Sequence, residues 1–353
     1  MENPSAWLYG PGDARIEECP MPTIDSPTDV IVRMGFVGVC GSDLHFWKHG
    51  GVQVFVSEKQ PLVMGHEGSG TVHDVGSAVT NVKAGDQVAI EGSYPCRICT
   101  RCKEGLYNLC PKMKFSAAPP DTNGMLTKYF KLSADMCYKL PEQISLQEGV
   151  ITEQLAVAAH AVRMVDVKPG QTVVIFGSGT IGLACGAVAK YYGAKKVIAI
   201  DIADSKLEFA KDFYNCSTYK YVLDDSPEKN AQKIIEDFGL ELGADAVIEC
   251  SGVESSVNCS VSVLRLGGQY VQTGLGKPMI NFPILTMSEK ELHMHGACRY
   301  GPDDFRVAVD VLNTGTVPVG KLITKIFDFE QTTEAWQATQ NGIGIKNMIR
   351  APS

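Results

Sequence analysis

The sequence has no apolar run long enough to cross a membrane, no low-complexity tract and no block of like charges. A membrane-spanning helix needs about 18 or more consecutive apolar residues, and residues 1–10 also lack the basic region and apolar run of a secretory signal. Basic residues are in the minority, with 32 Lys and Arg against 40 Asp and Glu and a formal net charge of −8. Nucleic acid requires a concentrated basic face. We therefore expect a soluble, cytoplasmic protein that binds neither membrane nor nucleic acid.

The length and composition indicate more than one domain. The chain has 353 residues, 44% of them hydrophobic, whereas a single hydrophobic core rarely serves more than about 250–300 residues. The N-terminal part, to about residue 150, is rich in glycine and proline and has short alternating apolar runs at Val30–Met34 and Gly70–Val75. Alternation between turn signals is typical of antiparallel strands. We expect a mostly β region there.

The middle of the chain has a different pattern. Segments of helical spacing, Ile181–Tyr192 and Ser205–Phe213, alternate with apolar runs that do not alternate internally, namely Thr172–Phe176, Val197–Asp201, Ala246–Cys250 and Gln269–Thr273. Such strands belong to a parallel sheet covered by helices on both faces. Further on we expect a helix over Asp303–Leu312 and a strand over Leu322–Phe327. The sequence thus predicts an α/β domain over 152–286, inserted into a mostly β domain made by residues 1–151 and 287–353.

Three glycines follow the first of these strands, in the string Gly177-Ser-Gly179-Thr180-Ile181-Gly182. In a dinucleotide-binding turn the first glycine allows the tight turn, the second lets the backbone approach the pyrophosphate, and the third lets helix pack on strand. The helix N-terminus adds unpaired N–H groups and a positive dipole end. An ordinary glycine turn is the alternative, which the strand–turn–helix context disfavours. We expect a doubly wound, Rossmann-type sheet.

One acidic residue indicates which dinucleotide binds. Asp201 ends the next strand, nineteen residues after Gly182. A carboxylate there accepts hydrogen bonds from the ribose hydroxyls and repels a 2′-phosphate, so NAD is favoured over NADP. Lys206 is close enough in sequence to soften this preference, and we include it in the predicted cofactor site.

Four of the twelve cysteines fall within fifteen residues, at Cys96, Cys99, Cys102 and Cys110. In a long chain such clustering indicates a metal before it indicates disulfides. Four thiolates complete the tetrahedral shell of zinc and leave no open position, so we expect a structural zinc. An iron–sulfur cluster is one alternative, although its bacterial spacing has a shorter last gap. A zinc-ribbon binding module is another, but it does not explain the dinucleotide turn.

A second set of metal-ligand residues is dispersed along the chain, at Cys40, His66, Glu67 and Glu153. One thiolate, one imidazole and one carboxylate, with a water, make a four-coordinate catalytic zinc. From spacing alone this set is weak, because isolated Cys and His residues in glycine-rich segments are more often structural. The residues by themselves leave both interpretations open.

Taken together, these motifs resemble the zinc-containing medium-chain alcohol dehydrogenase family, in the same order and over essentially the whole chain. The string Gly65-His-Glu-Gly-Ser-Gly70, with Gly76 and Val79, is similar to the zinc signature of that family. Within it the chain looks most like the sorbitol, xylitol and L-arabinitol dehydrogenases. The segments that carry this likeness are Cys40–Trp47, Tyr107–Pro111, Phe115, Pro119-Pro120, Glu153, Phe282–Ile284 and Arg299-Tyr300.

The resemblance implies a GroES-like zinc domain joined to the Rossmann-type NAD-binding domain, and it implies roles for single residues. The four dispersed residues hold or flank the catalytic zinc, with Glu67, Glu153 or both as the carboxylate. Arg299 and Tyr300 reach the distal hydroxyls of the substrate, and Phe115 forms a wall of the pocket. The chain departs from its relatives at other pocket positions, which leaves the preferred polyol open; these are Phe46, Gly51–Phe55, Ala118 and Gln154.

The implied reaction is oxidation of a secondary alcohol of a polyol to the ketose, with hydride passing to NAD. The proton leaves through Ser42, the nicotinamide ribose and His45, or through a water on Glu67 or Glu153. Sorbitol is the first candidate and xylitol the next; L-arabinitol, galactitol, a simple alcohol and threonine are alternatives. A zinc-free, NADPH-linked reductase of the same superfamily is a further alternative. The resemblance also suggests a homotetramer, with strand edges near residues 270–300 in contact.

Overall fold

A computed structural model describes residues 2–51, 54–119 and 122–353. The chain forms two compact units, one made by residues 1–153 and 301–353 and the other by residues 154–300. Val52 and Gln53 of the predicted pocket loop, and Pro120 of the paired prolines, lie outside the described residues.

The first unit is mostly β, as the alternating N-terminal runs predict. Its largest sheet runs in the order β10-β6-β5-β3-β18-β17, with β9 also paired to β3, and a three-stranded sheet has the order β2-β1-β4. The strands are β1 (Pro4–Gly10), β2 (Asp13–Glu18), β3 (Asp29–Gly38), β4 (Leu62–Val63), β5 (Glu67–Val75), β6 (Gln87–Ile90), β7 (Ser93–Tyr94), β8 (Lys114–Phe115), β9 (Tyr129–Ser133), β10 (Cys137–Lys139), β17 (Ile323–Phe327) and β18 (Lys346–Arg350).

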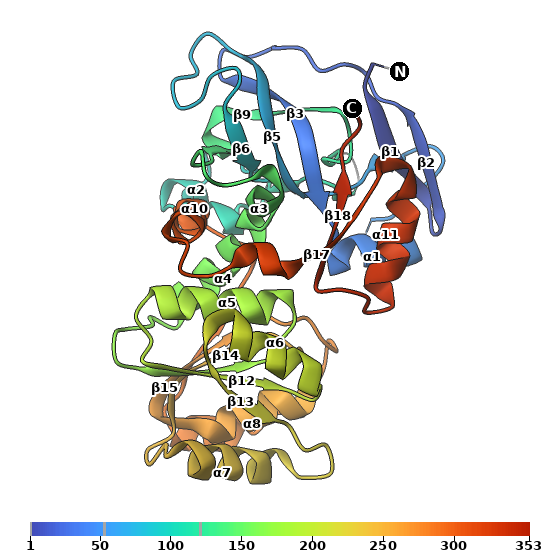
Figure 1. Cartoon of the computed structure of the whole chain (residues 1–353). Coiled ribbons are helices and arrows are strands. Elements are labelled where there is room, and N and C mark those ends of the chain that lie inside the picture. The colour runs from blue at the N-terminus through green and yellow to red at the C-terminus, as the bar shows by residue number, and fades with distance from the viewer. Residues whose placement is uncertain (1, 52–53, 120–121) are drawn as a thin grey trace. The chain divides into compact units, whose positions relative to one another are not determined.

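Short helices cover this unit, and its core lies between them and the sheets. The helices are α1 (Gly41–His49), α2 (Thr100–Lys103), α3 (Leu146–Val150), α10 (Asp304–Thr314) and α11 (Thr332–Gln340), with 3₁₀ turns η1 (Tyr107–Leu109), η2 (Ala134–Met136), η3 (Val319–Leu322) and η4 (Phe329–Gln331). The buried core includes Leu8, Met64 and Trp336, which come from both ends of the chain. Helix α11 packs against β18 and α1 (Figure 1).

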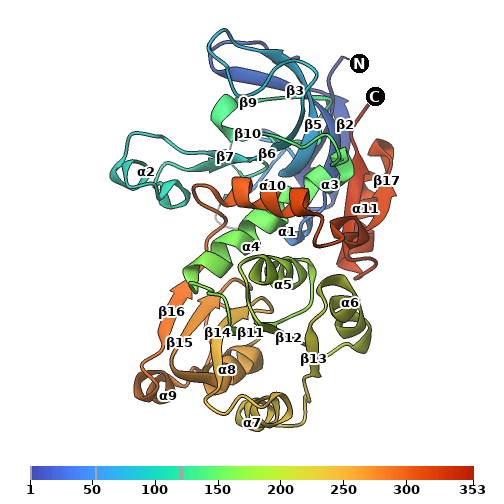
Figure 2. The same cartoon turned by 60° about the vertical axis from the view of Figure 1, so that its left-hand side comes forward.

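The second unit is a parallel six-stranded sheet in the order β13-β12-β11-β14-β15-β16. Helices α5 and α6 cover one face, and α7 and α8 cover the other (Figure 2). Its elements are β11 (Thr172–Phe176), α5 (Thr180–Tyr191), β12 (Lys196–Asp201), α6 (Asp204–Tyr214), β13 (Ser217–Lys220), α7 (Pro227–Phe238), β14 (Ala244–Glu249), α8 (Glu254–Val263), β15 (Leu264–Gln272), α9 (Ile284–Glu289) and β16 (His293–Gly296); α4 (Thr152–Met164) begins in the first unit and continues in the second. The strand order is that of a Rossmann-type, doubly wound sheet.

The expected second boundary, at 286/287, differs from the division at 300/301. The reason is β16, whose residues pair in parallel with β15 from Gln269↔His293 to Gln272↔Gly296 and so belong to the sheet. This strand is short and polar, and its pattern did not reveal it.

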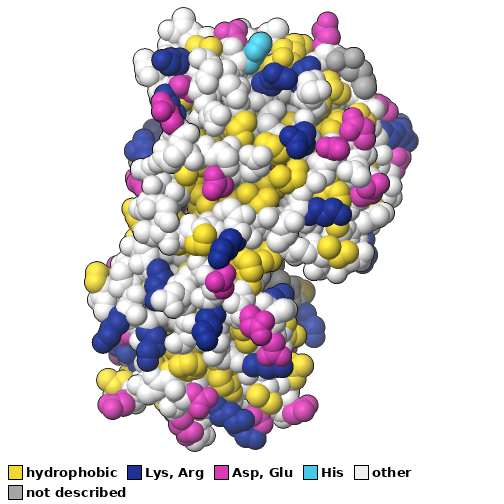
Figure 3. All heavy atoms as spheres, in the orientation of Figure 1, with side chains coloured by type: hydrophobic (Ala, Val, Ile, Leu, Met, Phe, Trp, Pro, Cys, Tyr) yellow, Lys and Arg dark blue, Asp and Glu magenta, His cyan; other side chains and the backbone are white. Residues whose placement is uncertain are grey.

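No described helix combines the length and the mean hydropathy required to span a bilayer. On the face drawn in Figure 3, basic and acidic side chains are interspersed, without a large region of one sign.

Candidate active site and metal centres

The pairing of two strands brings the dispersed metal-ligand residues together. Strands β3 and β5 are antiparallel, with Gly38 opposite Glu67. The carboxyl end of β3 therefore lies beside the start of β5, which places Cys40 near His66 and Glu67. The ligand atoms of these three residues lie within 4.8 Å of one another. We refer to Cys40, His66 and Glu67 as the Cys-His-Glu cluster.

Small residues make room for this cluster. A Cβ atom at Gly38 would lie 2.1 Å from Oε2 of Glu67, so only glycine leaves space for that carboxylate. Gly65, directly before His66, has a φ of +88°, a backbone conformation that favours glycine. Gly65 of the zinc-signature string and Gly38 on the paired strand are therefore both explained by the geometry around His66 and Glu67.

Asp43 orients the imidazole, and the sequence did not single it out. It is buried on the first turn of α1, where its Oδ2 accepts a hydrogen bond from the amide of Cys40 at 2.9 Å. Its Oδ1 lies 3.5 Å from Nδ1 of His66, which leaves Nε2 for a metal. A carboxylate behind a ligating histidine is a common arrangement in metal sites. The signal was present as an acidic residue three positions after a candidate thiolate ligand.

Lys346 is a second residue that the sequence did not single out. It begins β18, which pairs with β3, and it is buried. Its Nζ donates to Oε2 of Glu67 at 2.6 Å and to the carbonyl of Val39 at 3.0 Å. Glu153, buried on the first turn of α4, acts electrostatically on the same ammonium group. The carboxylate of Glu153 is not among the atoms of the Cys-His-Glu cluster.

The charges around the cluster favour a cation. Burial tends to lower the pKa of His66, but Asp43 and Cys40 outweigh burial and raise it well above its ordinary value. Burial likewise tends to lower the pKa of Lys346, and Glu67 outweighs it. The pKa values of His66 and Lys346 rise because acidic groups lie close to both side chains, which are buried. A thiolate, an imidazole and a carboxylate are also the donor types of catalytic zinc sites, so these residues fit that metal.

Three more predicted site residues belong to this unit. Oγ of Ser42 lies 3.5 Å from Nε2 of His66, and the ring of Phe115 lies 5.5 Å from the imidazole of His66. His45 follows Ser42 by three residues on α1, so both share one face of the helix, and its Nε2 lies 3.1 Å from the carbonyl oxygen of Gly51.

The four clustered cysteines form a second group in the loop between β7 and β8. The sulfur atoms of Cys96, Cys99, Cys102 and Cys110 lie within 4.8 Å of one another. The backbone amides of Ile98 and Cys99 donate to Cys96 and lower the pKa of its thiol to about 6. Four converging thiols with amide donors fit a tetrahedral metal of structural type.

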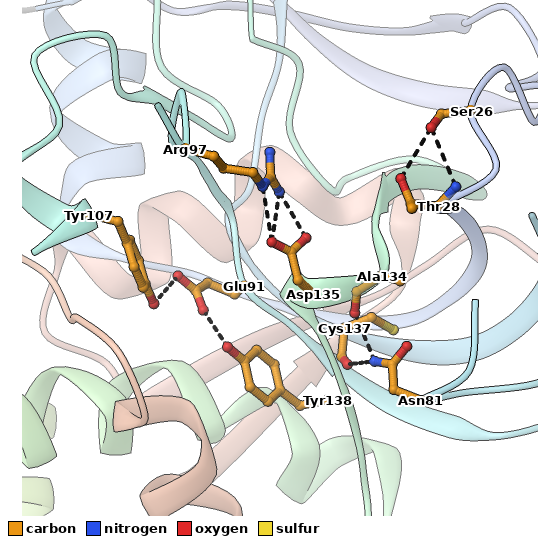
Figure 4. A network of polar contacts seen from close by, with 10 residues as sticks. All are labelled: Ser26, Thr28, Asn81, Glu91, Arg97, Tyr107, Ala134, Asp135, Cys137 and Tyr138. Atoms are coloured by element: carbon orange, nitrogen blue, oxygen red, sulfur yellow. Dashed lines mark hydrogen bonds and ion pairs between the residues drawn. The ribbon is translucent and has the colours of Figure 1, made fainter. Parts of the chain in front are cut away.

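Polar contacts fix this four-cysteine loop to the rest of its unit (Figure 4). Arg97 forms a bidentate ion pair with Asp135, with nitrogen–oxygen distances of 2.8–3.0 Å. The hydroxyl of Tyr107 donates to one carboxylate oxygen of Glu91 at 2.8 Å, and that of Tyr138 donates to the other at 2.8 Å. These contacts tie the loop to β6 and β10.

The predicted dinucleotide turn joins β11 to α5 in the second unit. Gly177 has a φ of +90°. Gly179 caps the helix with open space where a Cβ would lie, whereas a Cβ at Gly182 would lie 1.8 Å from the carbonyl oxygen of Gly177. Thr180 and Ile181 form the first turn of α5, the end of the helix whose dipole favours a negative charge. The buried hydroxyl of Ser178 has no hydrogen-bond partner in the described structure. Open space at Gly179, the N-terminal end of a helix and the unpaired hydroxyl of Ser178 fit a pyrophosphate.

Asp201 ends β12 beside this turn. Its Oδ2 accepts a hydrogen bond from the amide of Ser178 at 2.8 Å, and its Oδ1 accepts one from the amide of Ala203 at 3.0 Å. Nζ of Lys206 lies 3.9 Å from Oδ2 of Asp201. The acid and the lysine are thus neighbours, as their spacing suggests, and the lysine partly offsets the charge that disfavours a 2′-phosphate.

Arg299 and Tyr300 end the second unit, after β16. The side chain of Arg299 is exposed and its backbone has a φ of +55°. Tyr300 is fully buried. The two predicted substrate residues therefore belong to a different unit from the Cys-His-Glu cluster.

Comparisons with known proteins agree with this architecture. Residues 26–142 match the family model of the alcohol dehydrogenase GroES-like domain, and residues 180–314 match that of the zinc-binding dehydrogenases. Among solved structures, an Escherichia coli oxidoreductase of unknown specificity is 30% identical and superposes with a TM-score of 0.93 over the whole of both chains. L-idonate 5-dehydrogenase of Escherichia coli is 28% identical, with a TM-score of 0.87 over 99% of this chain and 98% of that one.

Curated relatives are more similar in sequence. D-xylulose reductase A of Aspergillus niger is 48% identical over 348 residues, which cover 99% of this chain and 96% of the relative. The probable D-xylulose reductase A of Emericella nidulans is also 48% identical, over 99% of this chain and 97% of its own. The chain therefore belongs to the zinc-containing medium-chain alcohol dehydrogenase family. Within that family it is an oxidoreductase of the polyol dehydrogenase group.

Proposed function

We propose that the protein is an NAD-linked, zinc-dependent dehydrogenase that interconverts a polyol and its ketose. The observation that supports it most is the Cys-His-Glu cluster, whose donor atoms converge within 4.8 Å, with His66 and Glu67 buried. When bound there, zinc supplies a Lewis acid that lowers the pKa of a coordinated hydroxyl, and NAD supplies the hydride acceptor.

In this proposal each residue of the chain has a defined task. Cys40 and His66 hold the metal, together with Glu67, with Glu153, or with a water that one of these carboxylates positions. Asp43 keeps Nε2 of His66 directed at the metal. Ser42, next to His66, takes the proton from the substrate hydroxyl. The proton then passes towards solvent by way of His45, which lies further along α1.

The remaining predicted residues bind the substrate, the cofactor and the structural zinc. Phe115 packs beside His66 and limits the pocket, and Arg299 and Tyr300 bind the distal hydroxyls. The dinucleotide turn binds the pyrophosphate of NAD, Asp201 its ribose, and Lys206 modulates the choice against NADP. Cys96, Cys99, Cys102 and Cys110 hold a structural zinc that has no open position.

Among polyols we place the xylitol and D-xylulose pair first. The sequence ranked sorbitol before xylitol, but relatives at 46–48% identity are D-xylulose reductases, and this reverses the order. L-arabinitol and galactitol follow. The chain departs from its relatives at Phe46, Ala118 and Gln154, so the ranking has to come from rates.

Initial rates test the proposal. We would measure them with NAD and NADP on xylitol, sorbitol, L-arabinitol, galactitol, ethanol and threonine, before and after chelation of zinc. We expect NAD-linked polyol rates that vanish on chelation and return with zinc. Cys40→Ser should abolish turnover, whereas the matched Cys19→Ser, outside both cysteine groups, should retain it. Turnover of ethanol or threonine alone would refute the polyol assignment and leave the zinc assignment intact. Full activity of zinc-free Cys40→Ser would refute the assignment of a catalytic zinc to this cluster.

We also propose that the chain forms a homo-oligomer, a tetramer by resemblance, through the sheet edge near residues 270–300. Strand β16 is the end strand of its sheet, and an edge strand is a template for pairing with a second chain. Apolar side chains in the loop that follows β15 are largely exposed, with Leu275 at 97% and Met279 at 84%. Light scattering should give a multiple of the 38.1 kDa chain, and Leu275→Glu with Met279→Glu should reduce it; a wild-type monomer would refute the oligomer.

A further inference from the structure

A carboxylate is buried at the end of β14. Glu249 has no exposed surface. Its Oε1 accepts hydrogen bonds from the amide of Ser251, at 3.0 Å, and from the hydroxyl of Ser251. Its Oε2 accepts from the amide of Gly252 and from Nε2 of Gln272, both at 2.8 Å. All four donors are neutral, and no ion pair to Glu249 occurs in the described part of the chain. Four donors suit the ionised form of the carboxyl, which only accepts.

This carboxylate joins the two turns that follow β14 and β15. Gln272 also donates to the carbonyl of Gly274 at 2.7 Å, and the carbonyl of Glu249 accepts the amides of Thr273 and Gly274, both at 2.8 Å. The turns pack closely, since a Cβ at Gly276 would lie 1.8 Å from the carbonyl oxygen of Gly252. Residues 250–252 and 273–276 are therefore held as one piece around Glu249.

The position of this piece in the sheet is specific. The strand order reverses between β11 and β14, where Phe176 pairs with Glu249 and accepts the amide of Cys250 at 2.8 Å. Dinucleotides bind at such a switch point, outside the carboxyl ends of the strands. Asp201, at the end of β12, marks the side of the adenosine ribose. If the ribose of adenosine binds at Asp201, the nicotinamide half would lie on the other side of the switch point, towards β14 and β15.

We propose that Glu249 is a positioning residue that stabilises bound NAD⁺ more than bound NADH in this cofactor site. The proposal rests on the NAD linkage proposed above. The two cofactor forms differ in charge at the nicotinamide ring, which is positive in NAD⁺ and neutral in NADH. A buried negative charge without a paired cation, on the nicotinamide side of the switch point, attracts only the oxidised form. Removal of one such charge should change the affinity for NAD⁺ on the order of tenfold at an effective dielectric constant of about 20.

Binding of the two nucleotides to the full-length protein tests this inference. NADH affinity is measured by its fluorescence and NAD⁺ affinity by competition. Glu249→Gln should weaken NAD⁺ about tenfold and leave NADH within about twofold of wild type. Gln272→Leu is the matched control, because it cuts the link between the turns and keeps the charge; it should weaken both nucleotides alike and leave their affinity ratio unchanged.

The exchange Glu249→Gln with Gln272→Glu guards against misfolding of the single variant. It keeps one carboxylate and one amide in the same pair of positions, so it should restore most of the wild-type ratio of NAD⁺ affinity to NADH affinity. Equal losses of NAD⁺ and NADH in Glu249→Gln, with normal binding by wild type, overturn this inference alone. A wild-type protein that binds neither nucleotide overturns the proposed NAD linkage and this inference with it.

Discussion

At the residue scale, the ion pair of Lys346 with Glu67 is enclosed on all sides, with both side chains at most 4% exposed. Removing one partner of a buried pair leaves the other charge uncompensated, which costs about 3–5 kcal/mol, whereas replacing both is often close to neutral. We expect Lys346→Met to lower the free energy of unfolding by that amount, measured by urea denaturation of zinc-free protein. Lys346→Met with Glu67→Gln should recover most of the loss. A double variant as unstable as the single one would contradict the reasoning.

Glu91, the acceptor for Tyr107 and Tyr138 in Figure 4, has a predictable pH dependence. Burial raises its pKa from the ordinary 4.5 to about 7, although the hydroxyls of both tyrosines act to lower it. The folded state therefore holds this proton more tightly than the unfolded state does. The contribution of Glu91 to stability is full below pH 4.5 and is lost as the pH rises to 7, by about 3 kcal/mol in all.

The measurement is the free energy of unfolding between pH 4.5 and 8 for wild type and Glu91→Gln. Gln does not titrate, so the variant should lack this part of the pH dependence, and the difference between the two proteins should change across pH 4.5–7 and be constant above it. Parallel curves for the two proteins would show that Glu91 is not the titrating group.

Two residues of the candidate site show why a single sequence left them out. Asp43 lies on the first turn of a helix, a place where acidic residues are common as caps. A lone lysine near the end of a chain is normally at the surface. Only the pairing of β18 with β3 puts Lys346 next to Glu67. Cys40, His66 and Glu67 were predictable through the family resemblance, because their spacing alone carried little information.

At the element scale, two glycines of the turn between β11 and α5 have different roles. Gly179 leaves room for a ligand, and Gly182 allows the helix to pack closely on the turn. A Cβ at Gly179 meets nothing within 4 Å, whereas one at Gly182 would lie 1.8 Å from the carbonyl oxygen of Gly177. We expect Gly179→Ala to keep the melting temperature of the nucleotide-free protein and to weaken NADH binding at least tenfold. Gly182→Ala should lower both the melting temperature and the affinity for NADH. Thermal melts and fluorescence titration measure them, and normal NADH binding by Gly179→Ala would count against this turn as the pyrophosphate site.

The same scale shows how far periodicity predicts the fold. The apolar run Thr172–Phe176 gave the bounds of β11, and the helix expected over Asp303–Leu312 is α10, shifted by one or two residues. These elements have strong periodic patterns. Strand β16 has four partly exposed residues, two of them histidines, and β18 begins with a buried lysine. Neither sequence pattern indicates a strand, because each segment becomes a strand only by pairing with another strand that is distant in the sequence.

At the scale of the whole molecule, one unit is assembled from both ends of the chain. The change from alternating to continuous apolar strands revealed the inserted sheet, and the pairing of β18 with β3 explains how the C-terminal segment returns to the first unit. Both candidate metal clusters lie in the first unit, with three ligand residues in one and four in the other, and the dinucleotide turn lies in the second unit.

This difference predicts that metal is lost in two steps. The Cys-His-Glu cluster leaves a position open to solvent ligands when it holds zinc, whereas four thiolates enclose the other ion completely. Zinc at a closed site also contributes folding free energy. Mild chelation should thus remove about one zinc per chain and abolish activity with little change in melting temperature, and harsher removal of the second zinc should lower the melting temperature. Cys99→Ser should melt early from the start and keep about one zinc. Zinc content, rates and melts measured on the same samples decide this: if activity and melting temperature fell together in a single step, the two clusters would not have the separate catalytic and structural roles assigned to them.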